Sequence, residues 1–201
     1  MNEKFRDKNR KRSARLSTWD YSWNAAYFIT ICTKNREHFF GEIINKEMIL
    51  SGVGELALKF WEEISEHFSF VYLDEFTVMP NHMHGIIVID KPLNDAPFTE
   101  LPKVIAQERF QHPGENSISS IIGSYKSVVS KNAHLINPDF AWQSRFHDHI
   151  IRDEDSFKRI KNYISNNPEN WKEDKFPNHS IGRFCTRKFT FIGTRHAFCL
   201  L

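Results

Sequence analysis

The sequence has few cysteines and no long apolar run. Its three cysteines, Cys32, Cys185 and Cys199, are odd in number and contain no Cys-x-x-Cys pair. This pattern indicates neither a disulfide framework nor a cysteine zinc site, and it predicts reduced thiols. No apolar stretch approaches the roughly 18 residues that a membrane span needs, and the first residues are charged where a signal peptide would be apolar. The sequence therefore predicts a cytoplasmic protein without membrane contact.

Positive charge is concentrated at the two ends, although the net charge is only +2. Residues 1–17 contain seven Lys or Arg and two acidic residues. Basic arms of this kind bind phosphate because binding releases counterions, but a solvated tail is equally compatible with this charge. Residues 181–201 alternate basic residues with phenylalanines and contain no acid. That composition suits phosphate contacts with base stacking, and it equally suits a final strand packed on the core.

The hydrophobic pattern predicts an α+β domain. A β-branched and aromatic run at 25–35 predicts a strand, and a short extended segment follows from Glu47. A turn at Gly52 and Gly54 then precedes a helix over 55–67. The apolar stripe of that helix is Leu56, Phe60 and Ile64. The remaining predicted elements are strands at 70–79, 82–90 and 142–151, and helices at 117–134 and from about 153 to Pro168.

The order of these elements is βαββαβ followed by one more helix. It is the split βαβ order of ferredoxin-like folds, and it predicts an antiparallel sheet with helices on one face, plus a C-terminal helix. Half of the eight prolines fall in 91–115, which we expect to be a loop insertion. The chain, 201 residues long, should form one domain over 20–175, between a basic arm (1–19) and a basic aromatic tail (176–201).

Two His-x-His pairs are candidates for metal binding. His82 and His84 begin one predicted strand, and His147 and His149 lie in another. The side chains of each pair should point the same way, because alternate residues of a strand share a face. With 10 histidines, chance alone gives roughly half a pair of this kind, so the spacing does not distinguish the two.

Two residues of the last predicted helix distinguish the two histidine pairs. Tyr163 and Asn167 are four residues apart, so on a helix both would border the apolar stripe that packs on the sheet. If this helix lies over the strand of His82 and His84, a hydroxyl and an amide oxygen would lie beside two imidazoles. Tyr125 is a rival nucleophile, but it sits within an apolar stripe, so core packing is its favoured role.

Three segments, in order along the chain, resemble the single-tyrosine HUH transposases. MPNHMHGII (79–87) is similar to their metal motif, and RLSTWDYSWNAAYFITICTKNREHFFG (15–41) resembles their first strand. WQSRFHDHIIRDEDSFKRIKNYISNNPENW (142–171) resembles the nucleophile region of the REP-associated tyrosine transposases, where the reactive tyrosine heads a Tyr-Ile-x-x-Asn-Pro segment. The likeness covers about residues 12–175, apart from the 91–115 insertion.

The resemblance implies a site and a reaction. Tyr163 would be the nucleophile, and His82, His84 and Asn167 would ligate Mg²⁺ or Mn²⁺. The enzyme would cleave single-stranded DNA at palindromic hairpins and rejoin it through a 5′-phosphotyrosine. This step needs no ATP, which agrees with the absence of a GxxxxGK[ST] loop. Related enzymes act as monomers and as dimers, so a homodimer is compatible. The residues expected to contact DNA are Arg10, Lys11, Arg12, Arg15, Lys126, Arg145, His149 and Arg152.

Two other functions are compatible with the sequence. A non-catalytic single-stranded nucleic-acid-binding module could use the same fold, with the basic arm and the aromatic residues as its binding groups. A metal-dependent hydrolase could use water as the nucleophile, with Tyr163 in a structural role.

Overall fold

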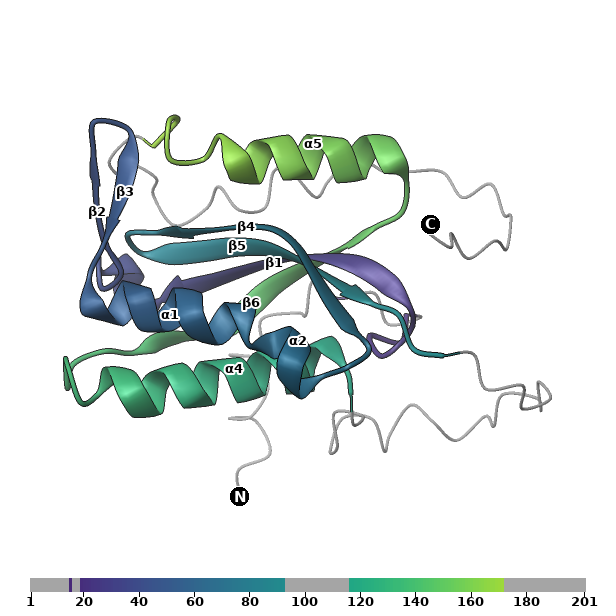
Figure 1. The fold of residues 1–201 in the computed structure, drawn as a ribbon, viewed down its shortest axis with the longest axis horizontal. Helices are drawn as coiled ribbons and strands as arrows, with labels where there is room; N and C mark the ends of the chain where they lie inside the picture. The colour runs from purple at the N-terminus through teal and green to yellow at the C-terminus, as the bar shows by residue number, and fades with distance from the viewer. Residues whose placement is uncertain (1–14, 16–18, 93–115, 172–201) are drawn as a thin grey trace, which may run out of the picture.

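The computed structural model describes Arg15 and residues 19–92 and 116–171. The predictions made for Arg10, Lys11 and Arg12, for nearly all of the 91–115 insertion and for the C-terminal tail lie outside these residues. The described part consists of a four-stranded sheet with helices against both faces and a small hairpin at one end (Figure 1).

The four-stranded sheet has the predicted ferredoxin-like topology. Its strand order is β4-β5-β1-β6, and each neighbouring pair is antiparallel. The fold class predicted from the sequence is therefore confirmed. The strands are β1 (Ala25–Thr33), β4 (Val71–Met79), β5 (His82–Ile89) and β6 (Trp142–Ile151). A short 3-10 turn, η1 (Lys34–Arg36), follows β1, and β2 (Gly41–Ile44) pairs with β3 (Glu47–Leu50) in a separate hairpin.

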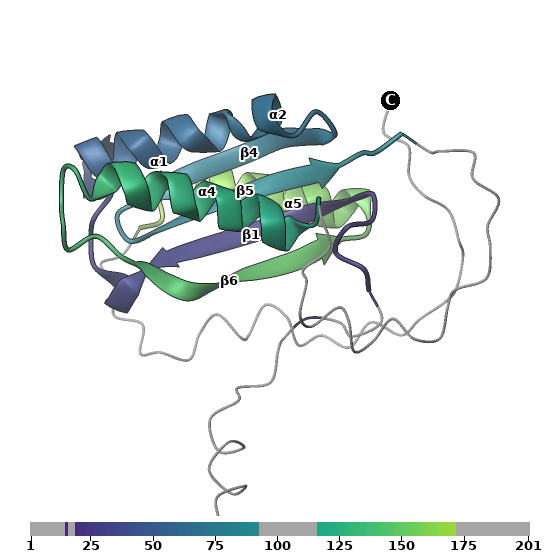
Figure 2. The same ribbon diagram turned by 90° about the horizontal axis from the view of Figure 1, so that it is seen from below.

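The helices divide the core into two parts. Figures 1 and 2 show α1 (Gly52–Glu62), α2 (Ile64–His67) and α4 (Ile118–Ala133) on one face of the sheet. The large core lies on this side and includes Tyr27, Ile29 and Ile31 of β1. The predicted C-terminal helix, α5 (Glu154–Ser165), covers the other face with a smaller core around Ile86 and Ile164.

The first helix begins earlier than predicted. Gly52 and Gly54 lie in its first turn, not in a turn that precedes it. Ser51 caps the helix, because its Oγ accepts a hydrogen bond from the Gly54 amide at 3.1 Å. Gly54 is needed at this position, since a Cβ there would lie 2.1 Å from the carbonyl oxygen of Phe40. The prediction of a turn here was wrong, because Gly54 is present to allow the close approach of the Phe40 backbone and not to form a turn.

The buried side of this helix also differs from the prediction. Val53, Ala57 and Trp61 are buried, whereas Leu56 and Phe60 are only partly buried. Apolar residues occupy more than one side of α1, so the spacing alone does not identify the side that meets α4 and the sheet. The predicted single helix is also interrupted at Glu63, where α1 ends and α2 follows.

The side chains of β5 alternate between the two faces of the sheet. Met83 and Ile87 contribute to the large core beside α1 and α4. His82, His84 and Ile86 have the opposite parity, and Ile86 belongs to the core beneath α5. Both histidines of the first pair therefore face α5.

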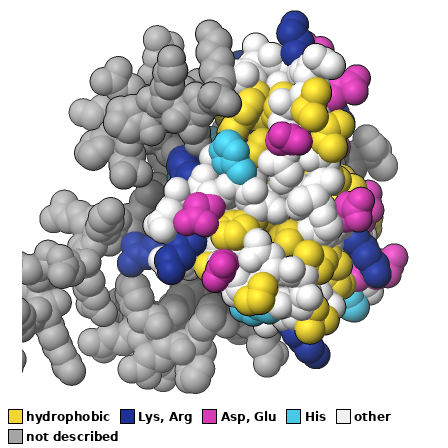
Figure 3. All heavy atoms as spheres, turned by 90° about the vertical axis from the view of Figure 1, so that its left-hand side faces the viewer, with side chains coloured by type: hydrophobic (Ala, Val, Ile, Leu, Met, Phe, Trp, Pro, Cys, Tyr) yellow, Lys and Arg dark blue, Asp and Glu magenta, His cyan; other side chains and the backbone are white. Residues whose placement is uncertain are grey.

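Apolar side chains are exposed at the end of the molecule formed by the β2–β3 hairpin and the end of α4. Ile44 and Ile49 lie on the hairpin, and Leu135 and Ile136 follow α4. Charged side chains interrupt the hydrophobic surface at this end (Figure 3). None of the described helices is long and apolar enough to cross a membrane.

Gly85 allows Trp61 to pack against β5. A Cβ at this position would lie 2.3 Å from Cζ2 of the fully buried Trp61 and 3.1 Å from the Phe76 Cβ. We expect Gly85→Ala to lower the free energy of unfolding by about 2 kcal/mol, measured by urea denaturation. Gly123→Ala is the matched control, because no atom lies within 4 Å of its added Cβ. It should be neutral or stabilise α4 by up to about 1 kcal/mol. Equal urea midpoints for Gly85→Ala and wild type would contradict this packing.

Candidate active site

His82 and His84 lie side by side at the start of β5. The Pro80-Asn81 turn leads into this strand, and both histidines are buried, with 7% and 6% of their surfaces exposed. Their ring centroids are 4.6 Å apart. The strand thus holds two imidazoles close enough to act on one ligand.

A polar neighbour orients each of the two rings. His82 Nδ1 lies 2.7 Å from Asn81 Oδ1, an atom that can only accept, so Nδ1 carries the proton and Nε2 keeps a lone pair. His84 Nδ1 lies 2.9 Å from Thr30 Oγ1 on β1. Imidazoles that bind metal ions commonly donate their other N–H to an oxygen in this way. Sequence reasoning missed both orienting residues. Asn81 could have been found from its position next to His82, whereas Thr30 depends on strand register.

Tyr163 meets this pair from α5. Its hydroxyl oxygen lies 3.3 Å from His84 Nε2, the nitrogen that Thr30 leaves available. The two ring centroids are 5.3 Å apart, and the Tyr163 ring meets the Phe28 ring edge-on. Tyr163 is 46% exposed, so a large substrate can reach its hydroxyl. The predicted convergence of this tyrosine and the first histidine pair is present.

The local sequence fixes the position of α5. Asp153 caps the helix, because its Oδ1 accepts a hydrogen bond from the Ser156 amide at 2.7 Å. On the buried side, Ile164 is completely covered, and the predicted stripe packs against Ile86 and Ile151. The stripe consists of Phe157, Ile160 and Ile164. Tyr163 precedes the most buried of these residues, so its ring lies at the edge of the packed face.

Burial keeps His84 in its neutral form. Desolvation lowers its pKa well below the ordinary value of 6.5, and the nearby His82, Arg36 and His147 lower it further. A neutral imidazole has a lone pair for a metal ion or for a hydroxyl proton.

Asn167 does not share a helical face with Tyr163, because α5 ends at Ser165. It lies in the following turn, where its amide donates to the carbonyl oxygen of Ile164 at 3.1 Å. Within the described residues, no hydrogen bond joins the Asn167 side chain to His82 or His84. Its role as a ligand stays a prediction.

The two histidines fit a divalent metal ion as part of a ligand set. Both are oriented through Nδ1, and His84 is neutral. No group of three or more His, Cys, Asp or Glu residues that could hold a metal occurs in the described ranges. Further ligands would have to be amide, water or phosphate oxygens, which suit Mg²⁺ and Mn²⁺.

The second histidine pair lies on the same face of the sheet as the first. Thr30 of β1 is paired with His84 on one side and with His147 on the other, and Phe28 is paired with His149. Burial lowers the pKa of both His147 and His149, so these imidazoles are also neutral at pH 7. Neutrality of the imidazole therefore does not distinguish His147 and His149 from His84. Tyr163 does, because its hydroxyl is at hydrogen-bonding distance from His84.

The residues expected to contact DNA fall on two sides of the sheet. His147 and His149 alternate along β6 and share the face of the site. Arg145 lies on the same strand where its register with β1 shifts, and Arg152 follows at the end of this edge strand. Lys126 lies on α4, on the opposite side, where its Nζ donates to the carbonyl oxygen of Gln143 at 2.7 Å.

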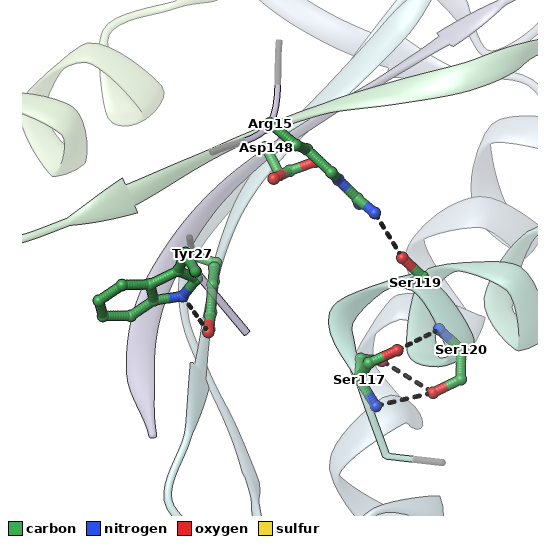
Figure 4. A network of polar contacts seen from close by, with 7 residues as sticks. Arg15, Tyr27, Ser117, Ser119, Ser120 and Asp148 are labelled. Carbon is green, nitrogen blue, oxygen red and sulfur yellow. Dashed lines mark hydrogen bonds and ion pairs between the residues drawn. The ribbon is translucent and has the colours of Figure 1, made fainter. Parts of the chain in front are cut away.

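Arg15 is anchored to the domain on the side of α4. Its Nε lies 2.7 Å from Asp148 Oδ1, and its Nη1 donates to Ser119 Oγ (Figure 4). The guanidinium also lies over the rings of Tyr21 and Phe146. The Asp148 side chain is only 3% exposed. The contacts of Arg15 thus attach the end of the basic arm to β6 and α4.

Removal of this anchor should cost stability. We expect Arg15→Ala to lower the free energy of unfolding by about 2 kcal/mol, because it leaves the Asp148 carboxylate buried without its cation. The double variant Arg15→Ala, Asp148→Ala should recover part of that loss. Lys59→Ala, which breaks an exposed pair with Glu63, is the control and should change stability by less than about 0.5 kcal/mol. Urea denaturation measures all three, and an unchanged midpoint for Arg15→Ala would refute the anchoring role.

Tyr125, the rival nucleophile, is part of the core. It is 2% exposed, and its hydroxyl donates to the carbonyl oxygen of Ala57 at 2.9 Å. Burial raises its pKa well above 10. The prediction that it packs in the core is confirmed. Cys32 is buried and forms no disulfide within the described residues, and the predictions for Cys185 and Cys199 lie outside them.

The fold and site together define a ferredoxin-like domain with a histidine pair and a helix-borne tyrosine on one sheet face. In the comparison with solved structures, this chain is similar to a REP-associated tyrosine transposase bound to a REP hairpin. The TM-score is 0.52 and the identity 17%, over 79% of this chain and 73% of that one. The resemblance inferred from the sequence is therefore confirmed at the level of the fold.

A sequence relative places the chain in a family. It is 39% identical over 170 residues to an uncharacterized protein of Haemophilus influenzae, covering 82% of this chain and 92% of that protein. The chain belongs to the same family as this Haemophilus protein. No model of a known protein family matches the sequence.

Proposed function

We propose that the protein is a transposase-like enzyme that cleaves and rejoins single-stranded DNA through a covalent bond to Tyr163. The observation that carries this proposal is the 3.3 Å distance between the Tyr163 hydroxyl and His84 Nε2, beside the His82 ring. A nucleophile and two potential metal ligands are thus within reach of one phosphodiester group. The transposase fold supports the same reaction class.

The residues of the site have separate tasks in this reaction. The Tyr163 oxygen attacks phosphorus and forms a 5′-phosphotyrosine, while the DNA 3′ oxygen leaves and takes up a proton. Thr30 and Asn81 hold the two imidazoles in place. With the His84 proton on Nδ1, Nε2 accepts a hydrogen bond from the Tyr163 hydroxyl while no ion is bound. When Nε2 binds the ion, the hydroxyl proton would pass to water. One phosphoester is exchanged for another, so the reverse attack by a 3′ hydroxyl rejoins DNA without ATP.

A divalent ion is part of the proposal. His82 and His84 would hold Mg²⁺ or Mn²⁺, with Asn167 as the third protein ligand. When bound, the ion would neutralise the negative charge that develops on the scissile phosphate.

The proposed substrate is a single strand that carries a hairpin. The solved structure of the same fold was determined with a REP hairpin, and in this chain Arg145 and His149 lie on the edge strand β6, with Arg152 directly after it. The two arginines can contact DNA phosphates, and the neutral His149 ring can hydrogen-bond to DNA.

The test is to trap the covalent intermediate. Full-length protein and Mg²⁺ are incubated with a single strand that carries a hairpin 5′ of an unpaired segment, and the protein mass is measured. An adduct that EDTA suppresses supports the proposal. Multiple turnover without an adduct would instead favour a hydrolase that uses water. Tight binding that EDTA does not affect, without cleavage at any metal concentration, would favour a non-catalytic binding module.

A further inference from the structure

The turn after β1 has a strained backbone beside the candidate site. Asn35 and Arg36 have φ angles of 53° and 58°, a region that residues other than glycine rarely adopt. Two such residues in succession cost free energy, and conformations of this kind persist where the surrounding structure holds them.

Hydrogen bonds hold this turn against the loop that leads to His82. The Thr33 amide donates to the carbonyl oxygen of Asn81 at 2.9 Å. The buried Thr33 hydroxyl lies 2.7 Å from the Glu37 carbonyl oxygen and 2.9 Å from that of Asn81. Thr33 thus joins both ends of the strained turn to the residue whose side chain orients His82.

Trp171 closes the same corner from the other end of the chain. Its ring centroid lies 5.9 Å from that of His82 and 6.0 Å from that of His38, which follows the strained turn. The Trp171 amide donates to the Pro168 carbonyl oxygen at 3.3 Å, so the segment after α5 turns back over the start of β5. Trp171 is partly exposed and can present ring surface to a ligand.

Arg36 brings positive charge to this corner. It is partly buried in η1, between Thr33, whose amide donates to the Asn81 carbonyl oxygen, and His38, whose ring centroid lies 6.0 Å from that of Trp171. A cation, an imidazole and an indole ring therefore lie next to the pair of imidazoles. Positive charge combined with an aromatic platform is the usual combination for binding unpaired nucleotides.

We propose that Arg36, His38 and Trp171 form a nucleotide subsite that binds the unpaired nucleotide next to the cleaved phosphate. Trp171 stacks on its base, His38 supports the indole ring, and Arg36 contacts the backbone phosphate. The subsite rests on the proposed function, because it defines which part of the single strand is held when Tyr163 attacks.

Binding without metal tests the subsite separately from the reaction. Full-length protein in EDTA is titrated with a fluorescent DNA hairpin that has a short unpaired thymidine flank on its 3′ side. A second probe has the same flank with abasic sugars. Trp171→Ala should weaken binding of the thymidine probe about tenfold and leave binding of the abasic probe unchanged, because only a base can stack. Trp171→Phe should restore most of the affinity.

Arg36→Gln should weaken binding of both probes severalfold, because both flanks have phosphates. Two controls match these variants. Trp23→Ala removes a tryptophan that is 47% exposed at the opposite end of β1, and Lys131→Gln removes an exposed cation of α4. Neither should change the affinity by more than about twofold.

Two results would overturn the subsite. The first is equal affinity of Trp171→Ala and wild type for the thymidine probe. The second is the same loss for both probes, which would give Trp171 a structural role only. Adduct formation is measured separately on the wild type. A base-dependent effect of Trp171 without any adduct would therefore refute the reaction and leave the subsite standing. An adduct without a base-dependent effect would do the reverse.

Discussion

Tyr163→Phe is expected to abolish the covalent protein–DNA adduct, with a loss of at least about a thousandfold in the rate of adduct formation. The substitution removes a single oxygen, the one that lies 3.3 Å from His84 Nε2. The ring can keep its contacts with Phe28 and His84, so the fold should not change. Intact-protein mass spectrometry after incubation with Mg²⁺ and the hairpin-bearing strand measures the adduct.

Tyr72→Phe is the matched control for this experiment. Tyr72 is also an exposed tyrosine, with 57% of its surface accessible, but it lies on β4 near the far end of the strand from the β4–β5 turn. Its loss should leave adduct formation within about twofold of wild type. If Tyr163→Phe formed as much adduct as wild type, the nucleophile would be another group and the proposed reaction would need a different site.

Much of the fold could be predicted because the strands and helices differ in period. The β-branched and aromatic run at 25–35 became β1, and the apolar residues of 117–134 repeat at helical spacing and became α4. The start of α1 could not be predicted from composition. Glycine is common in turns, but Gly54 is needed because the Phe40 carbonyl oxygen leaves no room for a Cβ. That contact joins segments that are not adjacent in the sequence.

The site was predictable to the extent that it depends on local spacing. Alternation along β5 puts His82 and His84 on one face, and the apolar stripe of α5 puts Tyr163 at the edge of the packed face. The rest depends on register. Thr30 meets His84 only because β1 pairs with β5 in one particular alignment, and no local pattern specifies it. Trp171 reaches the site through a turn after Asn167. Its position could not be predicted by continuing α5 as a regular helix.

The two histidine pairs provide the strongest test of the metal site. We expect His82→Ala and His84→Ala each to lower the cleavage rate at least about a hundredfold, because each removes one of the two nitrogens proposed to bind the ion. His147→Ala is the matched control. His147 lies on the same sheet face, across Thr30 from His84, whereas the Tyr163 hydroxyl lies 3.3 Å from Nε2 of His84. It should retain cleavage within about tenfold of wild type.

Mn²⁺ binding in the absence of DNA provides a readout that does not depend on cleavage. The affinity measured by calorimetry should fall for His84→Ala and remain for His147→Ala, and thermal melting shows whether each variant is folded. The reverse result would move the metal to β6. Strand β1 lies between β5 and β6, so an ion bound beside His147 and His149 would be one strand further from His84 and its neighbour Tyr163. The structure would then no longer support Tyr163 as the nucleophile. The comparison of His84→Ala with His147→Ala is decisive because Tyr163 lies next to His84. Reaction at one phosphate requires the metal ligand and the nucleophile to be neighbours.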